Sequence, residues 1–233
     1  MFSIAGIDLL EQEFLDHERT LLEILLQDKT TKKNIIWATD DYAELGEPYS
    51  FKKEILPELV TGEQDSLIQP RVEKALEHQT NRTRDKAEVF TPSWICNAQN
   101  NLVDEQWFGR KDVFNIQKEM SWKASADKIT FPDDRQHTWQ KYVDAQRLEI
   151  SCGEAPYLVS RYDTVTGETI PISQRIGLLD RKLRVVSENT ETEEEWFTWT
   201  KRAFQSVYGF EYQGDSLLLA RENLFANRKL LDN

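Results

Sequence analysis

The stretch Leu148-Glu-Ile-Ser-Cys-Gly-Glu-Ala-Pro-Tyr-Leu158 decides how the rest of the chain is organised. An apolar start, then small residues from Ser151 to Gly153, then a second apolar run predict a buried strand that turns tightly into a helix. Gly153 permits a close approach of the backbone to a ligand, and the N-terminus of the following helix offers free N–H groups. The stretch therefore indicates a cofactor site, although its single glycine also fits an ordinary strand-to-helix turn.

The composition indicates a folded protein with an acidic surface. Of the 233 residues, 39% are hydrophobic, 11% aromatic and 30% charged; the mean hydropathy is −0.63 and the formal net charge −12. A protein that binds DNA usually presents a basic face, so a nucleic-acid role would need a local patch or a partner. No apolar run reaches membrane-spanning length and no secretory signal is evident, so we expect a cytoplasmic protein.

Neither the cysteines nor the histidines indicate a reactive site. Cys96 and Cys152 lie far apart without metal-ligand spacing, and His17, His78 and His137 are scattered among charged residues. We therefore expect no disulfide, no metal centre and no catalytic histidine.

Residues 1–85 are predicted to form a helical, loop-rich region. Apolar residues recur at helical spacing from Ile7 to Gln27, and glycine and proline then interrupt the chain too often for long elements. At Phe90-Thr91-Pro92 we expect a turn in which Thr91 caps a helix and Pro92 occupies its first turn. This helix is expected to face inward through its apolar residues, which are Trp94, Ile95, Ala98 and Leu102.

Three apolar runs in the second half of the chain each end in an acid. The acids are Glu149, Asp180 after Ile176-Gly-Leu-Leu, and Asp215 after Tyr208-Gly-Phe-Glu-Tyr-Gln-Gly, with helical patterns between them. This order predicts an α/β fold with a partial Rossmann-like, doubly wound sheet in residues 86–233, where ligands bind at the carboxyl ends of the strands. Acids at successive strand ends suit an adenosine ligand, because carboxylates accept hydrogen bonds from ribose hydroxyls and from the adenine amino group.

Two local signals lie between and after these runs. The segment Asp163 to Glu168 predicts a hairpin that turns at Gly167. Thr192, with Glu195 three residues later, predicts a capping box at the start of a helix.

In this order, the motifs resemble those of the amino-methyltransferases of bacterial restriction-modification systems, which methylate adenine N6 with S-adenosylmethionine. Phe90-Thr91-Pro92 resembles the motif that contacts the methionine end of the cofactor, and Glu149 with Cys152-Gly153 resembles the first-strand motif. Asp180 is similar to the second-strand acid that holds the ribose, and Gly214-Asp215 to the third motif. The resemblance covers about residues 86–224. Within this range the amino-acid sequence is similar to that of proteins described as restriction endonuclease subunit M. It assigns the cofactor to Phe90, Thr91, Pro92, Glu149, Cys152, Gly153, Asp180 and Asp215.

One motif of this methyltransferase family is missing from the sequence. In the family, a catalytic motif of Asp or Asn followed by Pro-Pro and an aromatic residue positions the extruded adenine for methyl transfer. This sequence contains no Pro-Pro pair. The resemblance therefore implies the S-adenosylmethionine-binding part of a DNA (adenine-N6) methyltransferase, without catalytic residues and without a target-recognition domain. DNA would be read by a separate part, and a second methyltransferase or restriction subunit is the expected protein partner.

Two other functions remain open. The chain could be a non-catalytic interaction or regulatory subunit of a restriction-modification or phage-defence system that retained the fold but lost the chemistry. A nucleotide-using oxidoreductase with a degenerate glycine loop is the third hypothesis.

Overall fold

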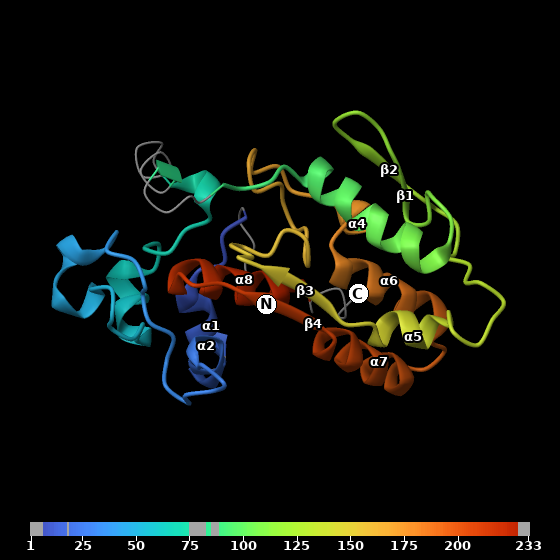
Figure 1. Cartoon of the computed structure of the whole chain (residues 1–233). Coiled ribbons are helices and arrows are strands. Elements are labelled where there is room, and N and C mark those ends of the chain that lie inside the picture. The colour runs from blue at the N-terminus through green and yellow to red at the C-terminus, as the bar shows by residue number, and fades with distance from the viewer. Residues whose placement is uncertain (1–6, 18, 75–82, 85–88, 228–233) are drawn as a thin grey trace. The chain divides into compact units, whose positions relative to one another are not determined.

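The computed structural model describes residues 7–17, 19–74, 83–84 and 89–227. In these residues the chain is a mixed α/β protein with helices and two small sheets of two strands each (Figure 1). No helix in the described ranges is both long and apolar enough to cross a membrane. The chain divides into an N-terminal unit, which comprises Met1–Val89, Ser151–Glu154 and Glu211–Ala226, and a central unit, which comprises Phe90–Ile150, Ala155–Phe210 and Asn227–Asn233.

The N-terminal unit is built from short helices around an apolar core. Helices α1 (Glu11–His17) and α2 (Arg19–Leu26) come from the predicted amphipathic segment, and α8 (Gly214–Ala226) packs against α2. From residue 27 to residue 74 the chain forms short 3-10 turns and isolated bridges, as the frequent glycines and prolines predicted. The fully buried core side chains include Phe14, Leu22, Leu26, Trp37, Ile55 and Leu218.

The central unit contains four described α-helices. They are α4 (Ser93–Phe108), α5 (Trp139–Asp144), α6 (Leu178–Asn189) and α7 (Glu193–Gln205), and α5, α6 and α7 pack on one another (Figure 1). The predicted start of α7 is confirmed, because the Thr192 hydroxyl accepts a hydrogen bond from the Glu195 N–H at 3.2 Å. The predicted hairpin is confirmed as well, since Tyr162 and Thr169 form an antiparallel bridge and Gly167 has φ +76°.

Each sheet of the central unit has two strands. Strands β1 (Asn115–Gln117) and β2 (Trp122–Ala124) are antiparallel, whereas β3 (Arg147–Ile150) and β4 (Val207–Phe210) are parallel. The connection from β3 to β4 contains α6 and α7, which is the strand-helix-strand order of α/β proteins. The strand predicted within the Leu148 stretch is thus present and is paired with β4. The prediction that this strand is buried is wrong, because Leu148 and Ile150 are 53% and 73% exposed.

The helix expected directly after β3 is absent. Ser151, Gly153 and Ala155 have φ values of +52°, +53° and +62°, which a right-handed helix does not allow, and Pro156 has no N–H to donate. Residues 153–158 form turns instead, and the next α-helix is α6.

The strand predicted to end at Asp180 is also wrong, because Leu178 begins α6. Gly177 is the N-cap of this helix, and a Cβ at Gly177 would lie 2.4 Å from the carbonyl oxygen of Leu158. Asp180 Oδ2 accepts the Gly177 N–H at 3.0 Å, which is the return bond of a capping box. The acid therefore marks a helix start and not a strand end.

The third predicted strand ends earlier than expected. Strand β4 stops at Phe210, and Gly214 and Asp215 begin α8. The Gly214 N–H donates to Trp37 O at 2.9 Å, and a Cβ at Gly214 would lie 2.0 Å from Ile36 O, so the backbones approach too closely for any side chain. Asp215 consequently lies in the first turn of a helix.

Candidate functional site

The Phe90-Thr91-Pro92 motif leads directly into α4. Pro92 is the N-cap residue of α4, and its side chain makes no capping hydrogen bond. The carboxylate of Asp163 accepts the Ser93 N–H at 2.7 Å, so the hairpin supplies the cap that Thr91 was predicted to supply. The Thr91 carbonyl instead accepts hydrogen bonds from Cys96 Sγ at 3.5 Å and Thr164 Oγ1 at 3.3 Å. The prediction that Thr91 caps α4 is therefore wrong.

Glu149 of β3 lies close to this motif. Its side chain is buried, and Oε1 accepts the Tyr157 N–H at 3.4 Å. Burial, followed by the charge of Glu149, raises the pKa of the Cys96 thiol to about 12, and the Tyr157 hydroxyl interacts with both Thr91 and Cys96. The structure thus brings together Thr91 and Glu149, two of the predicted site residues, around a protonated thiol and a tyrosine.

Cys152 and Gly153 belong to the N-terminal unit, as does the residue that follows β4 in the chain. Cys152 is buried, and the Gly153 N–H donates to Glu211 Oε2 at 2.7 Å. The other carboxylate oxygen of Glu211 accepts the N–H groups of Tyr212 at 2.8 Å and Gln213 at 3.1 Å. Glu211 was not singled out because the third apolar run, which begins at Tyr208, was predicted to extend to Asp215. The signal available in the sequence was Glu211 itself, which directly follows Phe210.

Asp180 is enclosed by protein hydrogen bonds. Its Oδ2 accepts from the N–H of Ser160 at 2.9 Å, from Ser160 Oγ at 2.8 Å and from the Gly177 N–H, while Oδ1 accepts from Asn227 Nδ2 at 2.7 Å. Burial raises the pKa of Asp180, and the charge of Arg175 opposes that rise. Four donors on one buried carboxylate make it a junction between the Ser160 segment, α6 and Asn227.

Asp215 has a comparable place in the N-terminal unit. Its side chain is fully buried, and Oδ2 accepts from the Tyr42 hydroxyl at 2.8 Å and from Lys74 Nζ at 3.2 Å. These contacts tie the first turn of α8 to segments more than a hundred residues earlier in the chain. Both of the later predicted acids therefore support the protein's own structure.

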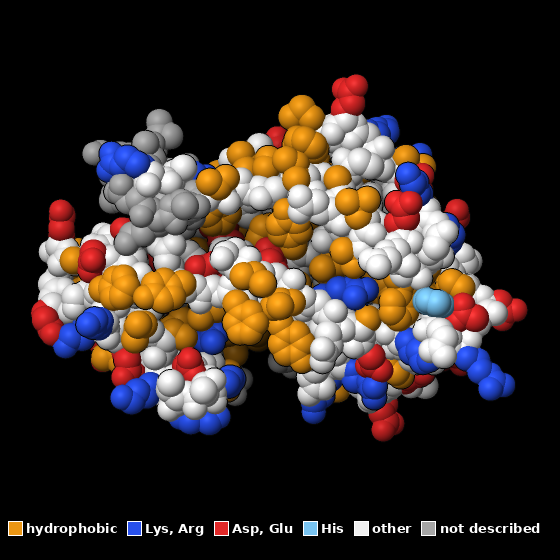
Figure 2. All heavy atoms as spheres, viewed as in Figure 1, with side chains coloured by type: hydrophobic (Ala, Val, Ile, Leu, Met, Phe, Trp, Pro, Cys, Tyr) orange, Lys and Arg blue, Asp and Glu red, His pale blue; other side chains and the backbone are white. Residues whose placement is uncertain are grey.

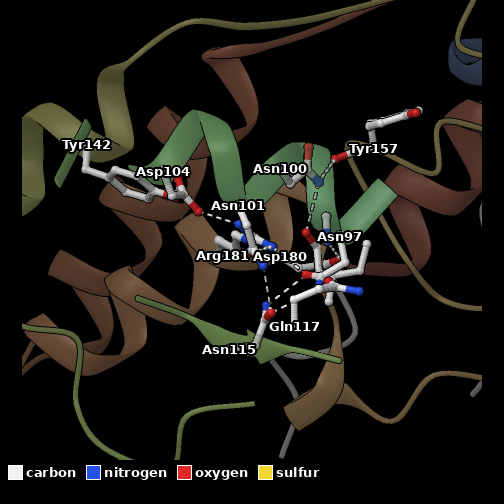
Figure 3. Close-up of polar contacts among 12 residues, drawn as sticks. Asn97, Asn100, Asn101, Asp104, Asn115, Gln117, Tyr142, Tyr157, Asp180 and Arg181 are labelled. Atoms are coloured by element: carbon white, nitrogen blue, oxygen red, sulfur yellow. Dashed lines mark hydrogen bonds and ion pairs between the residues drawn. The ribbon is translucent and has the colours of Figure 1, made fainter. Parts of the chain in front are cut away.

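The buried face of α4 is polar, contrary to the predicted apolar face. Leu102 is 64% exposed, whereas Asn97, Asn100 and Asp104 are buried. Figure 3 shows Asn97 and Asp104 of α4 directed toward Arg181 of α6, and Asn100 directed toward Tyr157. The positions 97, 100, 101 and 104 fall on one helical face, so the spacing of polar residues was the signal that could have predicted this.

Arg181 is the centre of the network. Its side chain is 1% exposed, Nη1 is ion-paired with Asp104, and Nη2 donates to Asn97 Oδ1 at 2.8 Å and Asn101 Oδ1 at 2.9 Å. The Tyr142 hydroxyl donates to the other oxygen of Asp104 at 2.9 Å (Figure 3). Burial and the charge of Asp104 raise the pKa of Tyr142 well above its usual value, so Tyr142 stays a donor.

Amides complete the network and connect it to the turn after β3. Asn97 and Asn115 exchange two hydrogen bonds of 2.8 Å. Asn100 Nδ2 donates to the carbonyl oxygens of Tyr157 and Ile176, both at 3.0 Å (Figure 3). One amide thereby fixes the turn beside Glu149 and the segment that precedes α6.

Comparisons with family models, with curated proteins and with solved structures found no match to this chain.

Proposed function

We propose that this chain is the S-adenosylmethionine-binding part of a DNA (adenine-N6) methyltransferase of a restriction-modification system. The observation that carries the proposal is the parallel β3–β4 pair, with Glu149 in β3 and the Phe90-Thr91-Pro92 motif anchored near Glu149. In parallel α/β sheets, ligands bind at the carboxyl ends of the strands. In this proposal β3 and β4 are neighbouring strands of a Rossmann-like sheet.

The donor and acceptor chemistry fits the cofactor. The ribose hydroxyls and the ammonium group of S-adenosylmethionine are donors, and carboxylates are acceptors. We assign Glu149 to the first-strand acid, whereas Asp180 no longer fits the second-strand acid, because it lies in a helix and not at the end of a strand. Thr91 and its neighbours would lie near the methionine end, as in the resembling family.

Methyl transfer itself is proposed to need another part. The sequence has no Pro-Pro motif to hold an extruded adenine. The net charge of −12 also favours reading of DNA by a separate, basic part, since phosphate contacts require cations.

Isothermal titration of S-adenosylmethionine into the protein tests the proposal. Saturable binding is expected, and Glu149→Gln should weaken it by about tenfold or more, because the uncharged amide is a weaker acceptor. Glu119→Gln, at an exposed position of the same unit, is the matched control and should bind as the parent does. Absence of heat at millimolar cofactor would refute the proposal, and stabilisation by NAD instead would favour the oxidoreductase hypothesis.

A non-catalytic interaction subunit is the second candidate, and one observation favours it. The face of the β3–β4 sheet that carries Leu148, Ile150, Tyr208 and Phe210 is exposed, and hydrophobic side chains gather over these strands in Figure 2. Contiguous apolar surface of this kind often marks a protein interface. The effect to measure is restriction or phage defence in cells. If Ile150→Lys abolishes this effect while Glu149→Gln leaves it intact, the interaction function is favoured over cofactor binding.

A further inference from the structure

A cavity of about 450 Å³ lies within the central unit, at a place that the proposed cofactor site does not use. One stripe of α6 forms a wall, the β1–β2 hairpin and the 3-10 turn Ile172–Gln174 form others, and Trp196 of α7 closes one side. Its volume lies in the range of small-molecule sites, which is roughly 300–1,000 Å³.

The apolar part of the lining offers contact to a hydrophobic body. It consists of Ile172, Leu183, the methyl groups of Ala124 and Ala126, and the Trp196 ring. The indole N–H of Trp196 already donates to Ser187 Oγ at 3.1 Å, which holds the ring in its orientation. A flat, apolar ligand could therefore pack against a ring that is already positioned.

Both carboxylates that line the cavity already accept hydrogen bonds from the protein. Asp180 accepts four hydrogen bonds, as described above, and Glu188 accepts from Arg184 Nε at 2.6 Å and from the Ile129 N–H at 2.8 Å. Neither carboxylate is therefore suited to a ligand that mainly donates hydrogen bonds.

The donors, in contrast, are not exhausted. Arg181 lines the cavity with a side chain that is 1% exposed, and its buried Nε has no hydrogen-bond partner among the described residues. Arg184 uses Nε for Glu188 and Nη2 for Asp127 O, and it remains partly exposed. Arg175 adds a third guanidinium to the lining; of the three, Arg181 is ion-paired with Asp104 and Arg184 with Glu188.

From these contacts we infer that the cavity binds a small apolar organic anion, with an aromatic or aliphatic body and one carboxylate or phosphate group. The body packs against Leu183 and Trp196, and the anionic group accepts hydrogen bonds from Arg184 and Arg181. A neutral ligand of the same shape lacks the charge-assisted hydrogen bonds, which are about twice as strong as neutral ones. This inference is independent of the proposed cofactor function.

The experiment is an NMR titration that follows the indole N–H signal of Trp196, assigned with a Trp196→Phe variant. The probes are 1-naphthoate, 1-naphthyl phosphate and the neutral 1-naphthalenemethanol. Saturable shifts are expected for at least one anion, with the neutral alcohol bound about tenfold more weakly. The stronger of the two anions identifies whether a carboxylate or a phosphate is preferred.

Two pairs of variants locate the binding. Ser125→Trp fills the cavity from the hairpin, and Lys123→Trp places the same ring at an exposed hairpin residue that does not line it. Arg184→Gln removes one cation, and Arg202→Gln removes an exposed one on α7. Ser125→Trp and Arg184→Gln should each weaken anion binding by about tenfold or more, with the two controls unchanged. Equal affinity for the neutral alcohol, unchanged binding by Ser125→Trp, or no saturable shift at millimolar anion would overturn the inference.

Discussion

The central unit buries polar groups in one region and exposes apolar groups in another. Between α4 and α6, asparagines and the Arg181–Asp104 pair are enclosed, whereas on the β3–β4 sheet Ile150 and Phe210 are 73% and 63% exposed. A buried polar network is stable only when its members are satisfied, and that requirement fixes geometry. Parallel sheets, in contrast, are normally covered on both faces. The comparison shows that α4 is held by specific hydrogen bonds, while the sheet retains apolar surface suited to a further segment or partner.

Removal of Arg181 should have the largest effect. Arg181→Leu leaves the Asp104 carboxylate buried beside Tyr142 without its cation, and loss of one member of a buried pair costs about 3–5 kcal/mol. Urea unfolding followed by circular dichroism measures the change. Arg202→Leu breaks the exposed pair with Asp144 and should cost about 0–1 kcal/mol. Equal losses in both variants would contradict the importance given to the buried network.

Asn100 should rank second. Asn100→Leu leaves the carbonyls of Tyr157 and Ile176 without the donor they share, which should lower the free energy of unfolding by about 2 kcal/mol. Gln99→Leu, at the exposed neighbouring position, should change it by less than about 0.5 kcal/mol. If the two variants unfold at the same urea concentration, the amide does not fix the turn beside Glu149.

A third prediction concerns the buried amine of Lys182. Burial, followed by the charge of Arg147, lowers the pKa of Lys182 to about 7, and Nζ donates to Val143 O at 2.9 Å. The unfolded chain holds this proton up to about pH 10.4, so between pH 7 and 9 the unfolded state binds more protons and stability rises with pH. The expected slope approaches about 1 kcal/mol per pH unit, and Lys182→Met should remove it. An identical pH dependence in parent and variant would contradict the prediction.

The exposed sheet face should contribute least to stability. Ile150→Lys is expected to change the free energy of unfolding by less than about 0.5 kcal/mol, because this side chain is already mostly in water. The same variant should clearly reduce the fluorescence of bound Nile red, a neutral apolar dye. Met120→Lys, at a 73% exposed position away from the sheet, should leave the dye signal unchanged. A loss of stability above 2 kcal/mol would mean that the face is packed in solution.

The sequence predicted elements where local chemistry decides them. The capping pair Thr192 and Glu195, the turn at Gly167 and the strand before Ser151 needed no long-range information. The strand predicted for the Ile176–Asp180 run was wrong because its apolar residues fit a helix as well as a strand. The need for glycine at position 177 depends on the distant Leu158, whose carbonyl oxygen leaves no room for a side chain there.

The candidate site could be predicted only in part, because most of its contacts join residues that are far apart in the sequence. Thr91 and Glu149 meet through Cys96 and Tyr157, and the resemblance had already singled out the first two. The saturation of Asp180 depends on Ser160 and Asn227, which lie 20 and 47 residues away. The polar residues of α4 recur at helical spacing, which indicates one face, but periodicity does not identify their partners Arg181 and Asn115.

The most direct test of the central claim is photochemical cross-linking of radiolabelled S-adenosylmethionine, followed by mass spectrometry of the labelled peptides. Label is expected in the segments that contain β3 and β4, residues 147–150 and 207–210, with competition by unlabelled S-adenosylhomocysteine and loss of label in Glu149→Gln. Label confined to residues 172–188, or label that the competitor does not displace, would contradict a cofactor site at the carboxyl ends of β3 and β4.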